Sequence, residues 1–220
     1  MVITSPDKIS QFISLEELRF TLHSEGCKMC SLGFQEGLSG CCVARGNPAS
    51  KRMIIGEAPG KHEDSQSIPF VGPAGRFLDK IFSSVGFNIN TDFYLTNIIL
   101  CRPIAEKGSG KENYTPRKEQ RNRCKPYLDA QINFINPRII ITIGKPATET
   151  ILGTTSIRMG DYRGKLLTNI PGTHGALIFP MLHPAAILHA QSQPNIYQLY
   201  REQTWQDIQI LRAIIDKENI

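Results

Sequence analysis

MIIGEAPG, at residues 53–60, joins a short apolar run to a turn that begins and ends with glycine. Similar apolar runs recur at 93–95, 139–143 and 177–179, with helix-like segments between them. Continuous apolar runs are typical of strands buried on both faces of a parallel sheet. The pattern therefore predicts an α/β fold: a three-layer α/β/α sandwich with a central, mostly parallel four-stranded sheet.

The segments between and after these runs predict helices at 74–85, 116–132, 146–152 and 197–217. In the last of them, Ile208, Leu211 and Ile215 share one face, as in a helix that packs on a sheet. The polar segment 105–115 is expected to be a mobile surface loop. Since 220 residues without a repeat or a linker-like stretch suit one core, we expect a single domain over residues 1–220.

Targeting signals are not evident in the sequence. There is no run of 18 apolar residues, and the first twelve residues lack the charged-then-apolar pattern of a signal peptide. We expect a cytoplasmic, monomeric protein without a membrane partner. In a reducing compartment its six cysteines favour metal binding or buried thiols over disulfides.

The positive charge is concentrated in one segment. Residues 101–125 carry eight lysines and arginines against three glutamates, an excess equal to the +5 of the whole chain. This segment is either a solvated face or a surface for phosphates, because basic clusters supply most non-specific affinity for nucleic acids.

Four cysteines have the spacing of a metal site. Cys27 and Cys30 are separated by two residues, and Cys101 and Cys124 can close the set. Thiolate sets of this kind bind zinc or iron-sulfur clusters, and the spacing leaves both open. Cys41 and Cys42 have no assigned role.

Polar residues follow three of the expected strands: the turn at 56–60, Asn97 and His183. Ligands of open α/β sheets bind at the carboxyl ends of strands, so one crevice is expected to unite these residues. The turn is not a Walker A loop, because only three residues separate its glycines and His62 follows Lys61. A plain strand-to-helix turn is the alternative interpretation.

The stretches GEAPGKHED at 56–64 and PFVGPAG at 69–75 resemble the first signature of family 4 uracil-DNA glycosylases, the iron-sulfur branch of that superfamily. Thr96-Asn97, CRP at 101–103, CKPYL at 124–128 and HPAAIL at 183–188 resemble its remaining signatures, in the same order. The resemblance covers Cys27 to about Leu188. It implies a monofunctional DNA repair enzyme that hydrolyses the N-glycosidic bond of uracil in single- and double-stranded DNA and leaves an abasic site.

The resemblance also implies a [4Fe-4S] cluster on Cys27, Cys30, Cys101 and Cys124. Its expected task is structural, because it would pin the N-terminal segment and the basic segment so that cations face the DNA backbone. Electron transfer is the alternative. The cations expected to contact DNA are Arg117, Lys118 and Arg121.

A base inside a duplex must be flipped into a pocket before an enzyme can act on it. By the resemblance, Gly56 and Ala58 belong to that pocket and Phe70 stacks on the base. The Asn97 amide can meet uracil O4 and N3–H together, whereas cytosine reverses this pattern. Glu63 is expected to crowd the position of a 5-methyl group and so to exclude thymine.

Two side chains are expected to act on the bond. His183 would face uracil O2, and Glu57 would position water or stabilise the positively charged sugar. Leu188 would wedge into the base stack as the base leaves. The alternative is that residues 185–188 simply begin a buried helix.

Two departures from the family pattern matter. Ser67 stands where the family usually has glycine, which puts the shape of the loop over the pocket in question. Segment 105–123 contains no histidine, unlike a related branch that becomes trapped on DNA, so we expect release of the product. The competing functions are a non-catalytic iron-sulfur module that binds nucleic acid, a glycosylase for another deaminated base, and an electron carrier or zinc-binding regulator.

Overall fold

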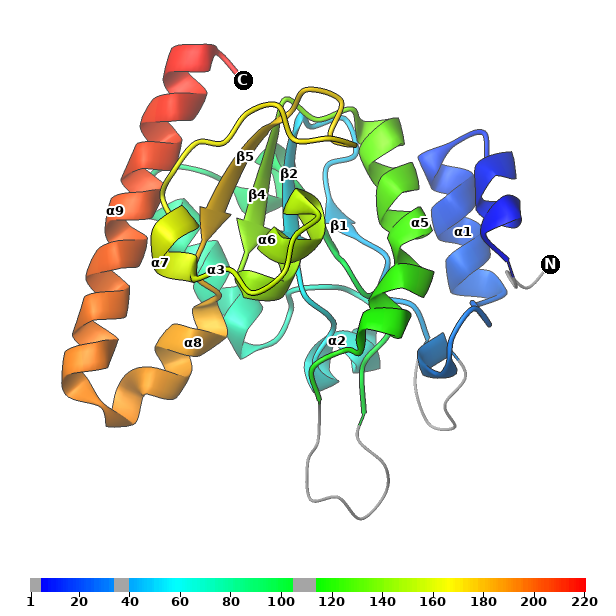
Figure 1. Cartoon of the computed structure of the whole chain (residues 1–220), viewed down its shortest axis with the longest axis horizontal. Coiled ribbons are helices and arrows are strands. Elements are labelled where there is room, and N and C mark those ends of the chain that lie inside the picture. The colour runs from blue at the N-terminus through cyan, green and yellow to red at the C-terminus, as the bar shows by residue number, and fades with distance from the viewer. Residues whose placement is uncertain (1–4, 34–39, 105–113) are drawn as a thin grey trace.

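The computed structural model describes residues 5–33, 40–104 and 114–220, and it has a central sheet between layers of helices (Figure 1). The strand order is β1-β3-β2-β4-β5. The bounds are β1 (Arg45–Gly46), β2 (Arg52–Gly56), β3 (Tyr94–Asn97), β4 (Ile139–Ile143) and β5 (Leu177–Met181). Among the described strands, the β1–β3 pair alone is antiparallel, and the other three pairs are parallel. The mostly parallel sheet is confirmed, but it has a fifth strand, because β1 is too short to leave an apolar run in the sequence.

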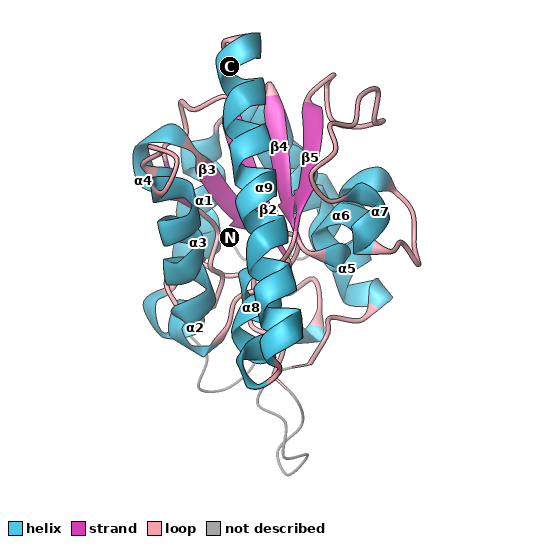
Figure 2. Cartoon of the chain, turned by 90° about the vertical axis from the view of Figure 1, so that its left-hand side faces the viewer, coloured by secondary structure: helices cyan, strands magenta, loops and turns pink. Residues whose placement is uncertain are grey.

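Helices cover both faces of the sheet, which confirms the three-layer arrangement (Figures 1 and 2). One face carries α1 (Leu15–Ser24), α5 (Lys118–Ile135) and α6 (Lys145–Leu152). The opposite face carries α3 (Pro73–Ser83) and α9 (Pro194–Glu218). Met53 and Ile55 pack with the first set of helices and Ile54 with the second. Successive strand residues point to opposite faces, so a fully apolar run fills both cores at once.

The four expected helices are present with displaced ends, and local backbone chemistry sets those ends. Helix α9 starts at Pro194, which suits a first turn because proline has no N–H to leave unpaired. Helix α5 continues to Ile135 and stops because Asn136 adopts a left-handed conformation with φ 46°. In the described part of the chain, no helix is long and apolar enough to cross a membrane.

Short helical elements complete the fold. They are α2 (Lys61–Gln66), α4 (Ile89–Asp92), α7 (Met159–Tyr162), α8 (Pro184–His189) and the 3₁₀ turns Pro6–Gln11, Ser31–Gly33 and Ala190–Ser192. None has enough turns to produce a helical periodicity in the sequence. The predicted loop at 105–115 lies, except for its last two residues, outside the described residues.

The strand register fixes which residues meet at the carboxyl edge of the sheet. Gly56 at the end of β2 pairs with Asn97 at the end of β3. Strand β5 ends at Met181, two residues before His183, and β4 ends at Ile143, directly before Gly144. The three predicted polar groups therefore emerge side by side at this edge.

Candidate active site and cysteine pocket

A cleft of about 630 Å³ opens at the carboxyl edge of the sheet. Its lining includes the following predicted residues: Glu57, Ala58, Glu63, Phe70, Asn97, His183 and Leu188. They come from segments up to 131 positions apart in the chain. The fold thus gathers them into one cavity, and their individual roles stay predictions.

Gly56 forms the point where the two expected base-binding side chains meet. A Cβ at Gly56 would lie 2.5 Å from Asn97 Oδ1 and 2.5 Å from Phe70 Cζ. Real Cβ atoms do not approach other atoms so closely, and the close contact therefore requires glycine. Asn97 and Phe70 are both buried, so their positions above Gly56 are fixed by packing.

The loop that carries Phe70 has two residues in the left-handed region, Ser67 with φ 54° and Phe70 with φ 59°. Ser67 ends α2, a position that favours glycine because a side chain there is strained. The departure at Ser67 therefore leaves a left-handed turn in place, at a cost of about 1 kcal/mol.

His183 is a neutral imidazole whose orientation is set by its own helix. Its Nδ1 accepts the backbone N–H of Ala185 at 3.1 Å and so caps α8. Burial, with a smaller effect of the His189 charge, lowers the pKa of His183 to about 4, although the Glu63 carboxylate opposes the change. Because Nδ1 is an acceptor, the proton of the neutral ring is assigned to Nε2, which is then available as a donor.

Gly144 makes room for this imidazole. Gly144 has φ 87°, and a Cβ there would lie 3.0 Å from the Cβ of His183. A side chain at position 144 would therefore be strained and would also press on His183.

Glu57 follows β2 directly and is half-buried in the cleft. Burial raises the pKa of its carboxyl, and the positive charge of Arg121 opposes that rise. The nearby guanidinium thus favours the ionised form, which is the form able to orient water or to oppose positive charge.

Glu63 fastens the two loops that border the cleft. Its Oε1 accepts the N–H of Gly72 at 2.7 Å, and its Oε2 accepts the N–H of Gly60 at 3.2 Å. A carboxylate that holds two backbone donors in a buried place is a strong local constraint. The structure places Glu63 at the cleft as expected, and its effect on thymine stays a prediction.

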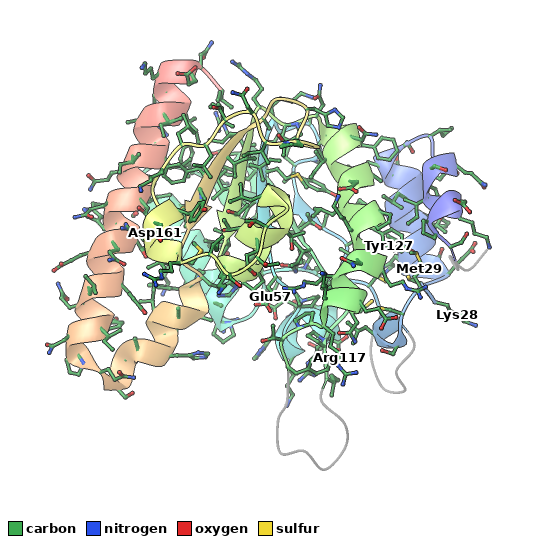
Figure 3. The ribbon with its side chains drawn as sticks, in the orientation of Figure 1. Lys28, Met29, Glu57, Arg117, Tyr127 and Asp161 are labelled. Carbon is green, nitrogen blue, oxygen red and sulfur yellow. The ribbon has the colours of Figure 1, made fainter. Side chains whose placement is uncertain are left out.

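The expected DNA-contacting residues lie at the rim. Leu188 lines the cleft from α8 and is half-buried. Arg117 and Lys118 are exposed at the start of α5, next to Pro116, which does line the cleft. Figure 3 shows Arg117 at that end of α5 and Glu57 nearby in the view. Arg117, Lys118 and Arg121 therefore lie beside the cleft and do not line it.

A second pocket is lined by cysteines. Five of the six share it, together with the Tyr127 ring: Cys27, Cys30, Cys41, Cys101 and Cys124. The Tyr127 hydroxyl donates to Cys27 Sγ at 3.0 Å, and the sulfurs of Cys41 and Cys101 lie 3.4 Å apart. The four predicted ligands are thus together, and Cys41 is an additional thiol that the sequence pattern missed.

Within the described residues, no group of three or more histidine, cysteine, aspartate or glutamate side chains is close enough for one metal ion. Four thiolates on one zinc ion would lie only about 4 Å apart, since a Zn–S bond is about 2.3 Å. The described residues offer no such group, and the cysteines that line the pocket are the donor type that a thiolate-bound group requires.

Cys42 has a separate role from its neighbour. It is fully buried, and its thiol donates to the carbonyl oxygen of Glu63 at 3.2 Å. It therefore supports the loop at the cleft, a contact that no spacing in the sequence could reveal.

The comparisons with known proteins agree with this geometry. The family model described as "Uracil DNA glycosylase superfamily" matches residues 43–209. The chain belongs to this superfamily.

Several similar proteins carry the name of one branch of this superfamily. A Type-4 uracil-DNA glycosylase of Saccharolobus solfataricus is 38% identical over 66% of this chain and 65% of its own length. Proteins of the same name from Sulfurisphaera tokodaii and Thermotoga maritima are 32% and 29% identical, over 86% and 87% of this chain and 81% and 91% of their own lengths. The chain thus spans just under two thirds of the first relative and most of the other two.

Proposed function

We propose that the protein is a monofunctional uracil-DNA glycosylase that hydrolyses the N-glycosidic bond of uracil in single- and double-stranded DNA and leaves an abasic site. The observation that carries the proposal is the convergence of the Asn97 amide and the Phe70 ring above Gly56. A flat base fits between a ring that stacks on its face and an amide that reads its edge. The relatives named Type-4 uracil-DNA glycosylase support the choice of base.

Selectivity for uracil rests on Asn97. Its N–H donates to O4 and its Oδ1 accepts from N3–H, whereas cytosine offers a donor and an acceptor in the opposite order. A cytosine would therefore leave buried polar groups unpaired, at a cost of about 1–3 kcal/mol for each group.

Bond cleavage separates charge, and two side chains are suited to the two ends. His183, neutral and protonated on Nε2, donates a hydrogen bond to uracil O2 as negative charge collects on the departing base. The ionised Glu57 orients the attacking water or stabilises the positively charged sugar, and both actions need the carboxylate.

DNA is held from the rim of the cleft. Leu188 fills the gap in the stack as the base leaves, which offsets part of the cost of unstacking. Arg117, Lys118 and Arg121 neutralise backbone phosphates beside the cleft, and binding therefore weakens as salt rises.

The cysteine pocket is proposed to hold a [4Fe-4S] cluster on Cys27, Cys30, Cys101 and Cys124. These four residues would hold the cluster, which would join the N-terminal segment to Cys101 and to α5, a structural function. Burial raises the pKa of the Cys27 thiol, and the hydrogen bond with Cys41 together with burial raises the pKa of the Cys101 thiol, so a bound cation would be needed to keep both as thiolates. Iron and sulfide analysis together with visible absorption tests this assignment, and zinc without sulfide would refute it.

The activity is tested by incubating the purified protein with an oligonucleotide that contains one uracil, in EDTA and without alkali before free base is scored. Matched oligonucleotides carry cytosine or thymine at the same position. Release of free uracil alone supports the proposal. No release from protein with a full complement of iron would refute it and favour the non-catalytic binding module.

A further inference from the structure

Arg45 connects the two walls of the cleft, although it does not line it. Its backbone pairs with Leu95 in the ladder between β1 and β3, two residues before Asn97. Its side chain crosses to the other wall, where Nη1 donates to the carbonyl oxygen of Phe70 at 2.9 Å. One residue thus ties the strand that ends in the base-reading amide to the loop that carries the stacking ring.

The Phe70 backbone needs such a tie. A phenylalanine with φ 59° is strained and persists only where its surroundings hold it. Its carbonyl also packs so closely on α3 that a Cβ at Gly75 would collide with it. The Arg45 guanidinium is the charged donor that binds this carbonyl.

Asp79 of α3 holds the guanidinium in place through an ion pair with Nη2. The Arg45 side chain is only 12% exposed and that of Asp79 is 34% exposed. A planar guanidinium can serve a carboxylate and a carbonyl with separate N–H groups in one fixed geometry. The fork between Asp79 and Phe70 therefore also fixes the distance from α3 to β1.

The arginine also has a buried donor that is unpaired. Among the described residues, Arg45 Nε is one of two buried side-chain nitrogen or oxygen atoms without a hydrogen-bond partner. An unpaired buried donor opposes folding, and such costs are concentrated at functional sites. The arginine is thus placed where its contact with Phe70 matters more than its own solvation.

We propose that Arg45, oriented by Asp79, is a positioning residue. It holds the Phe70 ring at the stacking distance from a uracil base whose edge the Asn97 amide reads. The inference rests on the proposed function and deepens it. It predicts that Arg45 acts on binding of the base itself, independently of DNA contacts and of the groups that act on the bond.

The test compares Arg45→Met, Arg45→Lys and Asp79→Asn. Methionine keeps an unbranched apolar chain without a donor, and lysine restores a charged donor. Arg52→Met is the matched control. Arg52 also donates to a backbone oxygen, that of Ile220, but Ile220 does not line the cleft. Each variant is first shown to be folded by its thermal unfolding.

The primary readout is the dissociation constant of free uracil, measured by calorimetry, because free uracil fills the pocket without DNA or catalysis. Arg45→Met is expected to weaken it about tenfold, the effect of one charged hydrogen bond, with Arg45→Lys closer to wild type. Asp79→Asn should weaken it less, and Arg52→Met should leave it unchanged. In single-turnover excision, the Arg45→Met defect should fall mainly on the substrate concentration for half-maximal rate.

Wild-type affinity for uracil in folded Arg45→Met would overturn the inference, and so would a lysine variant no better than methionine. If Arg45→Met does not fold, Asp79→Asn decides: unchanged uracil affinity there refutes the proposal. A wild-type protein that binds uracil but does not excise it would refute the proposed function and leave this comparison decisive. A wild-type protein that excises uracil from DNA but does not bind the free base would refute this inference and leave the proposed function standing.

Discussion

Acidification should destabilise this protein through His183 by an amount that the structure allows to be worked out. Burial lowers the pKa of His183 from 6.5 to about 4. As pH falls, the imidazole of the unfolded chain is therefore protonated near pH 6.5, whereas that of the folded chain is protonated only near pH 4. A histidine whose pKa is lower in the folded than in the unfolded state reduces the free energy of unfolding as pH falls from 6.5 to 4. At about 1.36 kcal/mol for each pH unit, the free energy of unfolding loses about 3 kcal/mol by pH 4 and roughly 2 kcal/mol by pH 5.

Other groups titrate with the opposite sign, so the effect must be isolated. The Asp207 carboxyl has its pKa raised to about 6 by burial, and the pKa of Glu57 is also raised. Both stabilise the fold as pH decreases. His183→Asn provides the comparison, since asparagine does not titrate here and its side-chain oxygen can still accept the N–H of Ala185.

The assay is denaturant unfolding of wild type and His183→Asn at pH 7 and pH 5. The free energy of unfolding of wild type should fall by roughly 2 kcal/mol more than that of the variant between the two values. Equal changes in both proteins would show that His183 is not held neutral by burial. The assignment of Nε2 as a hydrogen-bond donor to the base would then lose its basis.

The remaining predictions concern the cleft and the cysteines. Asn97→Asp should slow uracil release by about 10–100-fold, because a carboxylate cannot donate to O4; an unchanged ratio of uracil to cytosine release would contradict the base-reading role. Glu57→Gln should lower the single-turnover rate by about 10²–10⁴-fold and remove the rise of the wild-type rate with pH, whose midpoint lies above the ordinary carboxyl pKa. A variant whose rate still rises with pH in the same way would show that another group causes the rise. Leu188→Ala should slow excision from duplex more than from single strands, and equal losses would argue against a wedge. Cys27→Ala should lose iron and visible absorption, whereas Cys42→Ala should keep both; iron retained at wild-type content in Cys27→Ala would reject that ligand.

The fold was predictable where burial leaves a continuous signal in the chain. Strands β2, β3, β4 and β5 lie in apolar runs because both their faces are covered, and the amphipathic α9 has a regular stripe. Strand β1 has two residues, and its pairing with β3 is a long-range contact that no local pattern encodes. The short helix α2 was missed because it has too few turns to produce a helical periodicity.

The residues that line the candidate site were predictable from the sequence, whereas the contacts between their side chains and the rest of the fold were not. The strand-end argument placed Glu57, Asn97 and His183 at one cleft, since each lies at or just after the carboxyl end of a strand of the sheet. The contacts of Arg45 and Cys41 could not be predicted from the sequence, because each is made with a residue that only folding brings near. Side-chain geometry across a sheet edge is a tertiary property.

The adjacent residues Cys41 and Cys42 serve two different places. The first thiol lies against Cys101 in the cysteine pocket, and the second holds the carbonyl of Glu63 at the cleft. A single peptide unit therefore separates the two sites. We expect segment 40–46 not to tolerate an inserted or deleted residue, because a shift of one position would remove at least one of the two thiols from its site. In directed evolution, the length of this segment should therefore be kept constant.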